Sequence, residues 1–339
     1  MNVLLVSLVV LVGLLLVLEV GLRLLLGFGN PLLYLADEEI GYLLAPLQRT
    51  RRFGNRIAIN EYSMRCPTLT RTRPASTLRV LLLGDSVANG AWWTDQARTI
   101  SALITTQLEF VLGESSSETE ILQMPFERVE VLNASANSWG PRNELAYLKR
   151  FGTFEAQAVV LLLNTDDLFA AAPTSESVGR DRNYPNRKPA CALAEVFNRY
   201  LSPKLPQIGI KAVALAAQET AASKDDPLDS NLEAICQIQI LAAGTGAEFL
   251  LAMTPLWREI GEPGPRDYEL KARDCLTQLT QDQPISYLDF LPIFNRFETP
   301  QKLYRDHIHL SPQGNQVVSE AIARSLQHLL HLPPTTTKG

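Results

Sequence analysis

The sequence has few of the residues that mark several common classes of protein. Among 339 residues there are only four cysteines, and no two of them form a Cys-x-x-Cys pair. So low a number argues against a disulfide-rich scaffold, although an even number of cysteines could still pair. The four are Cys66, Cys191, Cys236 and Cys275. Cysteine content therefore leaves the redox compartment open.

The sequence also has no excess of positive charge. The formal net charge at pH 7 is −5, and the sequence has neither a basic stretch interleaved with aromatic residues nor a glycine-rich phosphate loop. These absences argue against a nucleic-acid-binding function and indicate no nucleotide cofactor. No internal repeat is present, which excludes a solenoid.

A long apolar stretch opens the sequence. Residues 3–28 are almost wholly apolar apart from Glu19 and Arg23, which are four residues apart in the order that favours an ion pair on one helix face. As a helix this stretch would extend about 39 Å, which exceeds the ~30 Å hydrocarbon core of a bilayer. We therefore expect residues 1–28 to be a retained, single-pass transmembrane anchor.

A cleaved signal peptide is the main alternative. The apolar stretch is too long for the core of a signal peptide, no Lys or Arg precedes it, and no Ala-x-Ala cleavage site follows it. The side of the membrane is a separate question, because the positive-inside rule alone would keep the rest of the chain in the cytoplasm. The arginines that carry this argument are Arg49, Arg51, Arg52 and Arg56.

Apolar strand segments alternate with helical segments in the rest of the chain. Strands are expected at 79–84, 128–134, 158–163, 248–253 and 285–289, and helices at 99–113, 142–152, 228–243, 267–281 and 311–331. Repeated strand-then-helix order predicts an α/β fold in which a parallel five-stranded sheet is covered by helices on both faces, in three layers.

Two short motifs in this region carry hydrolytic chemistry. A Gly-Asp-Ser motif that ends at Ser86 follows the first apolar strand, where open α/β sheets bind ligands. Asp306 and His309 lie three residues apart near the end of the chain. A serine hydroxyl needs a base to take its proton, and histidine can do this when a carboxylate fixes its tautomer. His307 could instead contribute to a metal site, but no third ligand is indicated.

These motifs resemble the SGNH or GDSL hydrolase superfamily, whose members have Gly-Asp-Ser near the amino end of the domain and Asp-x-x-His near its carboxyl end. The resemblance covers the chain from about residue 79 to its end. It implies a flavodoxin-like fold in which Ser86 is the nucleophile, His309 the base and Asp306 the carboxylate that orients the base. It also implies an oxyanion hole made of the serine amide, a glycine amide and an asparagine side chain.

Two positions depart from the family pattern. Ser138 occupies the usual glycine position of the second block, and Gly140 follows two residues later. A backbone amide is still available there to act with the amide of Ser86. In the third block Asp166 occupies the asparagine position, and an ionised carboxylate has no proton to donate. Either Asn164 has taken that role, or the activity is weakened or altered.

Weaker signals concern the substrate. Trp92, Trp93 and Trp139 follow two of the catalytic blocks and could bind a sugar or an acyl group, with core packing as the alternative. Residues 170–230 form an insertion whose polar loop is expected to line the crevice as a lid, with a solvated loop as the alternative.

The chain is thus divided into an anchor (1–28), a connector packed on the domain (29–77), a hydrolase domain (78–333) and a disordered tail (334–339). We expect a serine esterase of the cell membrane that hydrolyses an acyl ester, such as an acetyl ester, of a cell-surface glycan or lipid. The resemblance favours an extracytoplasmic domain. An O-acyltransferase with the same residues and an inactive binding or scaffold protein are the alternatives. No metal or other cofactor is expected.

Overall fold

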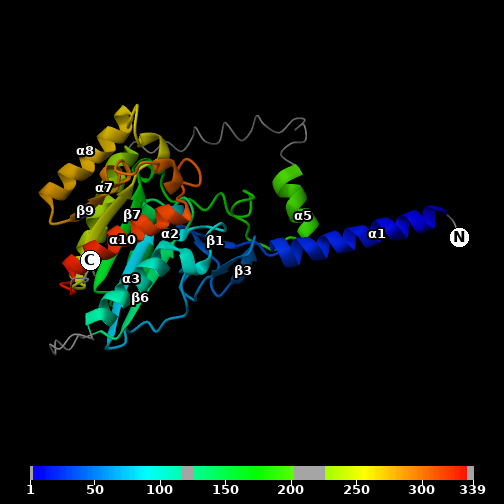
Figure 1. Ribbon diagram of the computed structural model, residues 1–339, viewed down its shortest axis with the longest axis horizontal. Helices are drawn as coiled ribbons and strands as arrows, with labels where there is room; N and C mark the ends of the chain where they lie inside the picture. The colour runs from blue at the N-terminus through cyan, green and yellow to red at the C-terminus, as the bar shows by residue number, and fades with distance from the viewer. Residues whose placement is uncertain (1–2, 116–125, 202–225, 334–339) are drawn as a thin grey trace.

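The computed structural model describes residues 3–115, 126–201 and 226–333 (Figure 1). The expected tail at 334–339 and part of the expected insertion, 202–225, lie outside these residues. At the amino end, α1 (Val3–Gly21) continues into the short π-helix η1 (Leu22–Leu26). Together they form a 24-residue apolar helix that projects from the body and has the length and composition needed to cross a membrane.

The body is built on a five-stranded sheet with the order β6-β5-β7-β8-β9, and every neighbouring pair of strands is parallel. Its strands are β5 (Thr77–Gly84), β6 (Arg128–Ser135), β7 (Ala158–Asn164), β8 (Glu248–Thr254) and β9 (Ser286–Asp289). Every residue of β5 and β7 is buried, which explains the apolar runs at 80–83 and 158–163. The expected fold class is confirmed.

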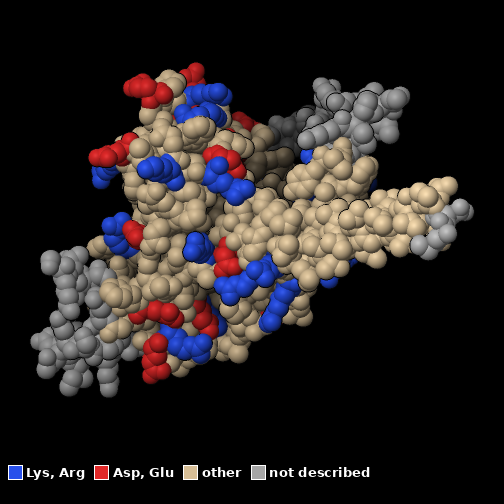
Figure 2. Space-filling view, turned by 45° about the vertical axis from the view of Figure 1, so that its right-hand side comes forward, with Lys and Arg blue, Asp and Glu red and all other residues tan. Residues whose placement is uncertain are grey.

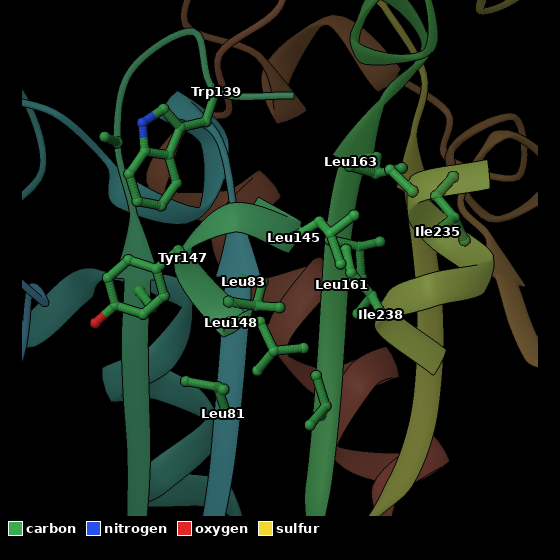
Figure 3. Packing of buried hydrophobic residues seen from close by; sticks show 14 of the residues in the cluster. Leu81, Leu83, Trp139, Leu145, Tyr147, Leu148, Leu161, Leu163, Ile235 and Ile238 are labelled. Carbon is green, nitrogen blue, oxygen red and sulfur yellow. The ribbon is translucent and has the colours of Figure 1, made fainter. Parts of the chain in front are cut away.

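Helices cover both faces of the sheet. One face carries α4 (Pro141–Phe151), α7 (Pro227–Gly244) and α8 (Asp267–Asp282), and the other carries α3 (Ile100–Ser115) and α10 (Pro312–Leu329). Successive side chains of a strand point to opposite faces. Leu81 and Leu83 of β5 therefore pack with α4 and α7 (Figure 3), whereas Val80 and Leu82 pack with α3 and α10. The ends of these ten elements differ from the expected ends by at most two residues.

The segment between the apolar helix and the sheet folds into two antiparallel hairpins. These are β1 (Tyr34–Asp37) with β2 (Gly41–Leu44), and β3 (Arg49–Arg52) with β4 (Asn55–Ala58). Tyr34, Ile40 and Met64 are buried in the same hydrophobic cluster as α4 and α7. The hairpins therefore share the core of the α/β body.

Arg65 follows these hairpins and is almost completely buried. Its guanidinium donates hydrogen bonds to the carbonyl oxygens of Asn89 and Ala91 at 2.5 Å each, and to that of Thr94 at 2.5 Å. Burial lowers the pKa of Arg65 to about 10, so the guanidinium stays charged at neutral pH. One side chain thus fixes the loop that follows the Gly-Asp-Ser motif.

We expect Arg65→Met to lower the free energy of unfolding by about 2–5 kcal/mol, because several buried carbonyl oxygens lose their charged partner. Urea titration of the full-length protein in detergent micelles measures the change. Arg324 is exposed on α10, and Arg324→Met should change stability by less than about 0.5 kcal/mol. Equal effects of the two substitutions would contradict the role assigned to Arg65.

Candidate active site

Ser86 lies at the carboxyl edge of the sheet, in the sharp turn between β5 and the short helix α2 (Ser86–Asn89). The turn is tight because a Cβ atom at Gly84 would lie 2.6 Å from the carbonyl oxygen of Leu162 in β7, so only glycine fits there. Asp85 caps α2 by accepting a hydrogen bond of 2.8 Å from the amide of Val87. Strand packing and helix capping together hold Ser86 at a fixed position.

Three side chains form a continuous hydrogen-bonded chain at this edge. The Oγ atom of Ser86 is 3.0 Å from Nε2 of His309, and Nδ1 of His309 is 2.9 Å from each carboxylate oxygen of Asp306. Ser86 and His309 are 223 residues apart in the sequence. The fold therefore brings together the hydroxyl, imidazole and carboxylate that activate a serine nucleophile.

Asp306 is held as a carboxylate. Partial burial raises its pKa, but hydrogen bonds from the backbone amides of His309 and Ile308 and from the imidazole of His309 outweigh this effect, so the pKa lies below its usual value. His307 lies outside this arrangement, because its side chain is 82% exposed and its Nδ1 is 3.9 Å from Asp306. Of the two neighbouring histidines, only His309 contacts Ser86.

Aromatic side chains support the imidazole. The rings of Trp93 and His309 pack edge to face with their centroids 4.4 Å apart. The Arg305 guanidinium lies 5.0 Å from the Trp93 ring centroid and 5.3 Å from that of Trp92. Both tryptophans line the cavity at Ser86. Trp139 does not, because it is buried and donates its Nε1 hydrogen to the carbonyl oxygen of Tyr42. The expectation that Trp139 contacts substrate is therefore corrected.

Ser86 and His309 open into a cavity of about 280 Å³. Beside them it is lined by Trp92, Trp93, Asn137, Ser138 and Tyr184, and its far wall includes Phe28, Arg52, Arg199 and Tyr200. This volume lies near the lower end of the range for small-molecule sites, ~300–1,000 Å³. The cavity is large enough for a short acyl group and part of the alcohol that carries it.

Three of the expected oxyanion residues have other partners. The amide of Gly140 donates to Oδ1 of Asn143 at 3.0 Å, which caps α4. Nδ2 of Asn164 donates to Asp85 at 3.0 Å, and Asn164 does not line the cavity at Ser86. Asp166 is exposed, and its carboxylate accepts a hydrogen bond from the hydroxyl of Tyr268. These interactions correct the expectations for Gly140, Asn164 and Asp166.

Ser138 and its neighbour Asn137 line the cavity instead. Ser138 has a positive φ of 59°, and its hydroxyl accepts a hydrogen bond of 2.9 Å from Tyr184. Oδ1 of Asn137 is buried and has no hydrogen-bond partner among the described residues. Nothing in the sequence singles out Asn137, although it precedes the position of the family glycine. Asn137 nevertheless lines the cavity from this loop.

A cluster of buried carboxyl groups lies behind Ser86. Asp85, Glu144 and Asp167 are all buried, and burial raises the pKa of each. Mutual repulsion adds to this effect, because the charge of Asp85 raises the pKa of Glu144 and of Asp167. Both carboxyl oxygens of Glu144 lack a hydrogen-bond partner among the described residues. Burial and the charge of Asp85 therefore favour the neutral form of Glu144, a feature that sequence reasoning missed.

Neither a metal site nor a disulfide is found in the part of the chain that the structure describes. No group of three or more His, Cys, Asp or Glu side chains there is arranged to hold a metal ion. All four cysteines are free thiols, and Cys66 is buried.

The fold and the Ser-His-Asp arrangement define a serine hydrolase that acts on esters. The model of the GDSL-like lipase/acylhydrolase family matches residues 82–317, and the chain belongs to this family. Expected membership of the SGNH or GDSL group is thus confirmed. No curated protein matches the chain.

Several solved structures are similar over most of the chain. An acetylxylan esterase from Geobacillus stearothermophilus is 14% identical, with 76% of this chain and 96% of that chain covered at a TM-score of 0.45. A lipase/acylhydrolase from Enterococcus faecalis is 12% identical, with 76% and 99% covered at a TM-score of 0.41. The acetyl xylan esterase AlAXEase is 12% identical, with 73% and 99% covered at a TM-score of 0.44.

The buried carboxyl groups predict an unusual dependence of stability on pH. The pKa of Glu144 is higher in the folded protein than its ordinary value of about 4.5 in the unfolded chain, so the folded state holds an extra proton above that pH. Its contribution to stability is full below pH ~4.5 and is lost as the pH rises toward the folded pKa. Glu144→Gln keeps the neutral shape and removes the titration.

We therefore expect Glu144→Gln to stabilise the protein at pH 7.5, by up to about 4 kcal/mol if Glu144 is still neutral in the fold at that pH, and to leave its stability at pH 4 nearly unchanged. Urea titrations at the two pH values measure the difference. Glu320 is exposed on α10, so Glu320→Gln should alter neither value. A parallel shift of the whole pH profile by Glu144→Gln would show that Glu144 is ionised in the folded state.

Proposed function

We propose that the protein hydrolyses an acyl ester through a covalent acyl-enzyme, with Ser86 as nucleophile, His309 as general base and Asp306 as the residue that orients His309. The observation that carries this proposal is the hydrogen-bonded chain from Oγ of Ser86 through His309 to Asp306. No other described serine is hydrogen-bonded to a histidine ring. The ionised state of Asp306 supports its role, because it stabilises the imidazolium that forms during attack.

The reaction proceeds in two halves. His309 accepts the proton of Ser86 as Oγ attacks the ester carbonyl, and then gives that proton to the departing alcohol as the carbon–oxygen bond breaks. The acyl group is then bound to Oγ. His309 next takes a proton from water, whose oxygen attacks the acyl carbon, and returns the proton to Oγ as the acid leaves.

The oxyanion hole in this proposal consists of the backbone amides of Ser86 and Ser138 and the side-chain amide of Asn137. Support comes from the cavity, because all three residues line it together with His309. Asn137 replaces the asparagine that the family takes from the position of Asp166. An uncharged donor there avoids the repulsion that a carboxylate would exert on the developing oxyanion.

The substrate is proposed to be a short-chain ester, such as an acetyl ester, of a glycan or lipid at the cell surface. The cavity of about 280 Å³ supports a short acyl group, and the faces of Trp92 and Trp93 support contact with a sugar ring or an apolar chain. The apolar helix of residues 3–26 is proposed to anchor the protein as a single span, with the domain on the extracytoplasmic side. Its length of 24 residues and its apolar composition support the span.

Ser86→Ala should abolish hydrolysis of p-nitrophenyl acetate and labelling by a fluorophosphonate, while stability changes by less than about 1 kcal/mol. His309→Ala should be nearly as damaging, because the serine then has no base. His307→Ala serves as the matched control and should retain the parent rate. Comparable losses for both histidine variants, or parent activity in Ser86→Ala, would refute these assignments.

Asn137→Ala should lower kcat about a hundredfold with little change in KM, because the lost hydrogen bond forms mainly to the charge of the transition state. Asp166→Asn should change neither constant by more than about twofold, since Asp166 contacts Tyr268 and not the cavity. Steady-state kinetics on p-nitrophenyl acetate separates the two constants. A tenfold or larger gain in Asp166→Asn, with Asn137→Ala silent, would place Asp166 in the oxyanion hole instead.

A further inference from the structure

The far wall of the active-site cavity is built from residues at the base of the apolar helix. Phe28 lies two residues beyond the end of η1, and it lines the same cavity as Ser86 and His309. Arg199 and Tyr200, from the short helix η4 (Phe197–Leu201), complete this wall. A single cavity therefore extends from the catalytic serine to the point where the apolar helix joins the body.

The segment that carries this wall is tied directly to the apolar helix. Its first part, α5 (Ala192–Val196), lies beside α1 (Figure 1), and the amides of Ala192 and Leu193 donate to the carboxylate of Glu19 at 2.8 and 2.9 Å. Glu195 accepts a hydrogen bond of 2.6 Å from the amide of Gly29 and pairs with Arg52. These contacts fix α5 and η4 at the base of the apolar helix.

The same segment exposes apolar side chains beside the helix. Phe197 is 46% exposed and Leu201 is 51% exposed, although neither lines the cavity. At the base of the apolar helix, Leu24 and Leu25 are 71% and 74% exposed. The apolar surface of the helix thus continues onto η4.

Basic side chains accompany this apolar surface. Arg180, Arg182, Arg187 and Lys188 line a groove whose opposite side includes residues of α5 and η4. All four are exposed, and none forms an ion pair within the described residues. Figure 2 shows the apolar helix as a rod almost free of charge that projects from a body with many Lys and Arg side chains. Apolar side chains next to unpaired cations are typical of segments that lie on an anionic lipid surface.

We propose that residues 179–201 lie on the surface of the bilayer that holds the apolar helix, with Phe197 and Leu201 inserted among the lipids and the four cations on anionic headgroups. The cavity then opens at the membrane surface and receives an ester carried by a lipid, not one dissolved in water. This inference rests on the proposed span and nucleophile, and it selects the lipid-borne substrate from the proposed classes.

The proposal can be tested with two fluorophosphonate probes. Both react with Ser86, but one reaches it from the bilayer and the other from water. One carries a long alkyl chain and partitions into bilayers, and the other carries a polyethylene glycol chain and stays in water. The full-length protein is reconstituted in phosphatidylglycerol–phosphatidylcholine vesicles, and labelling rates are measured. Phe197→Ser with Leu201→Ser should lower the alkyl-probe rate about tenfold and leave the water-soluble probe unaffected.

Control variants separate the parts of the proposal. Ile240 is 63% exposed on α7, away from the apolar helix, and Ile240→Ser should change neither rate. Arg180→Gln with Arg187→Gln and Lys188→Gln should slow the alkyl probe in vesicles that contain phosphatidylglycerol but not in pure phosphatidylcholine.

The outcomes are distinguishable. An unchanged alkyl-probe rate in the Phe197 and Leu201 double variant would refute the membrane-surface placement, and so would equal losses for both probes. Equal losses in the two lipids for the triple variant would refute the role of anionic headgroups. Absence of labelling of the parent protein by either probe would instead refute the proposed nucleophile.

Discussion

The arrangement of the active site at the carboxyl edge of the sheet depends on one buried cation, the guanidinium of Arg65. Arg65 comes from the segment before the sheet, yet its guanidinium binds carbonyl oxygens of the loop that follows Ser86. That loop carries Trp92 and Trp93, and Trp93 packs on His309. A charged group buried among carbonyl dipoles tolerates little displacement, because each lost hydrogen bond leaves it poorly solvated. The position of the histidine ring thus depends on a residue that belongs to neither sequence motif.

Much of the body could be predicted because its sequence signals are local. Strands buried on both faces contain unbroken apolar runs, and the helices between them begin and end within two residues of their expected ends. The pairing of Ser86 with His309 was also predictable, because both motifs follow from the chemistry of a serine nucleophile. The two hairpins at 34–58 were not predicted as such, since their short strands have no long apolar pattern.

The positions of the candidate oxyanion groups could not be predicted for a different reason. Gly140, Asn164 and Asp166 have suitable groups near the right strands, but hydrogen bonds to other residues decide where those groups point. Asn164 is directed to Asp85, which is 79 residues earlier in the chain. The capping of α5 by Glu19 of the apolar helix spans 173 residues and likewise has no local signature. Pairings of this kind arise only when distant segments meet.

The contact between Glu19 and α5 has a consequence for how an anchored form of this protein meets its substrate. A helix bonded to the body in this way cannot act as a loose tether, so the opening of the cavity keeps one orientation relative to the helix axis. For the proposed lipid-borne ester, encounters between the cavity and its substrate would take place by lateral diffusion in the plane of the bilayer. The reaction rate would follow the mole fraction of the ester among the surrounding lipids, and dilution of the bulk solution would leave that rate unchanged.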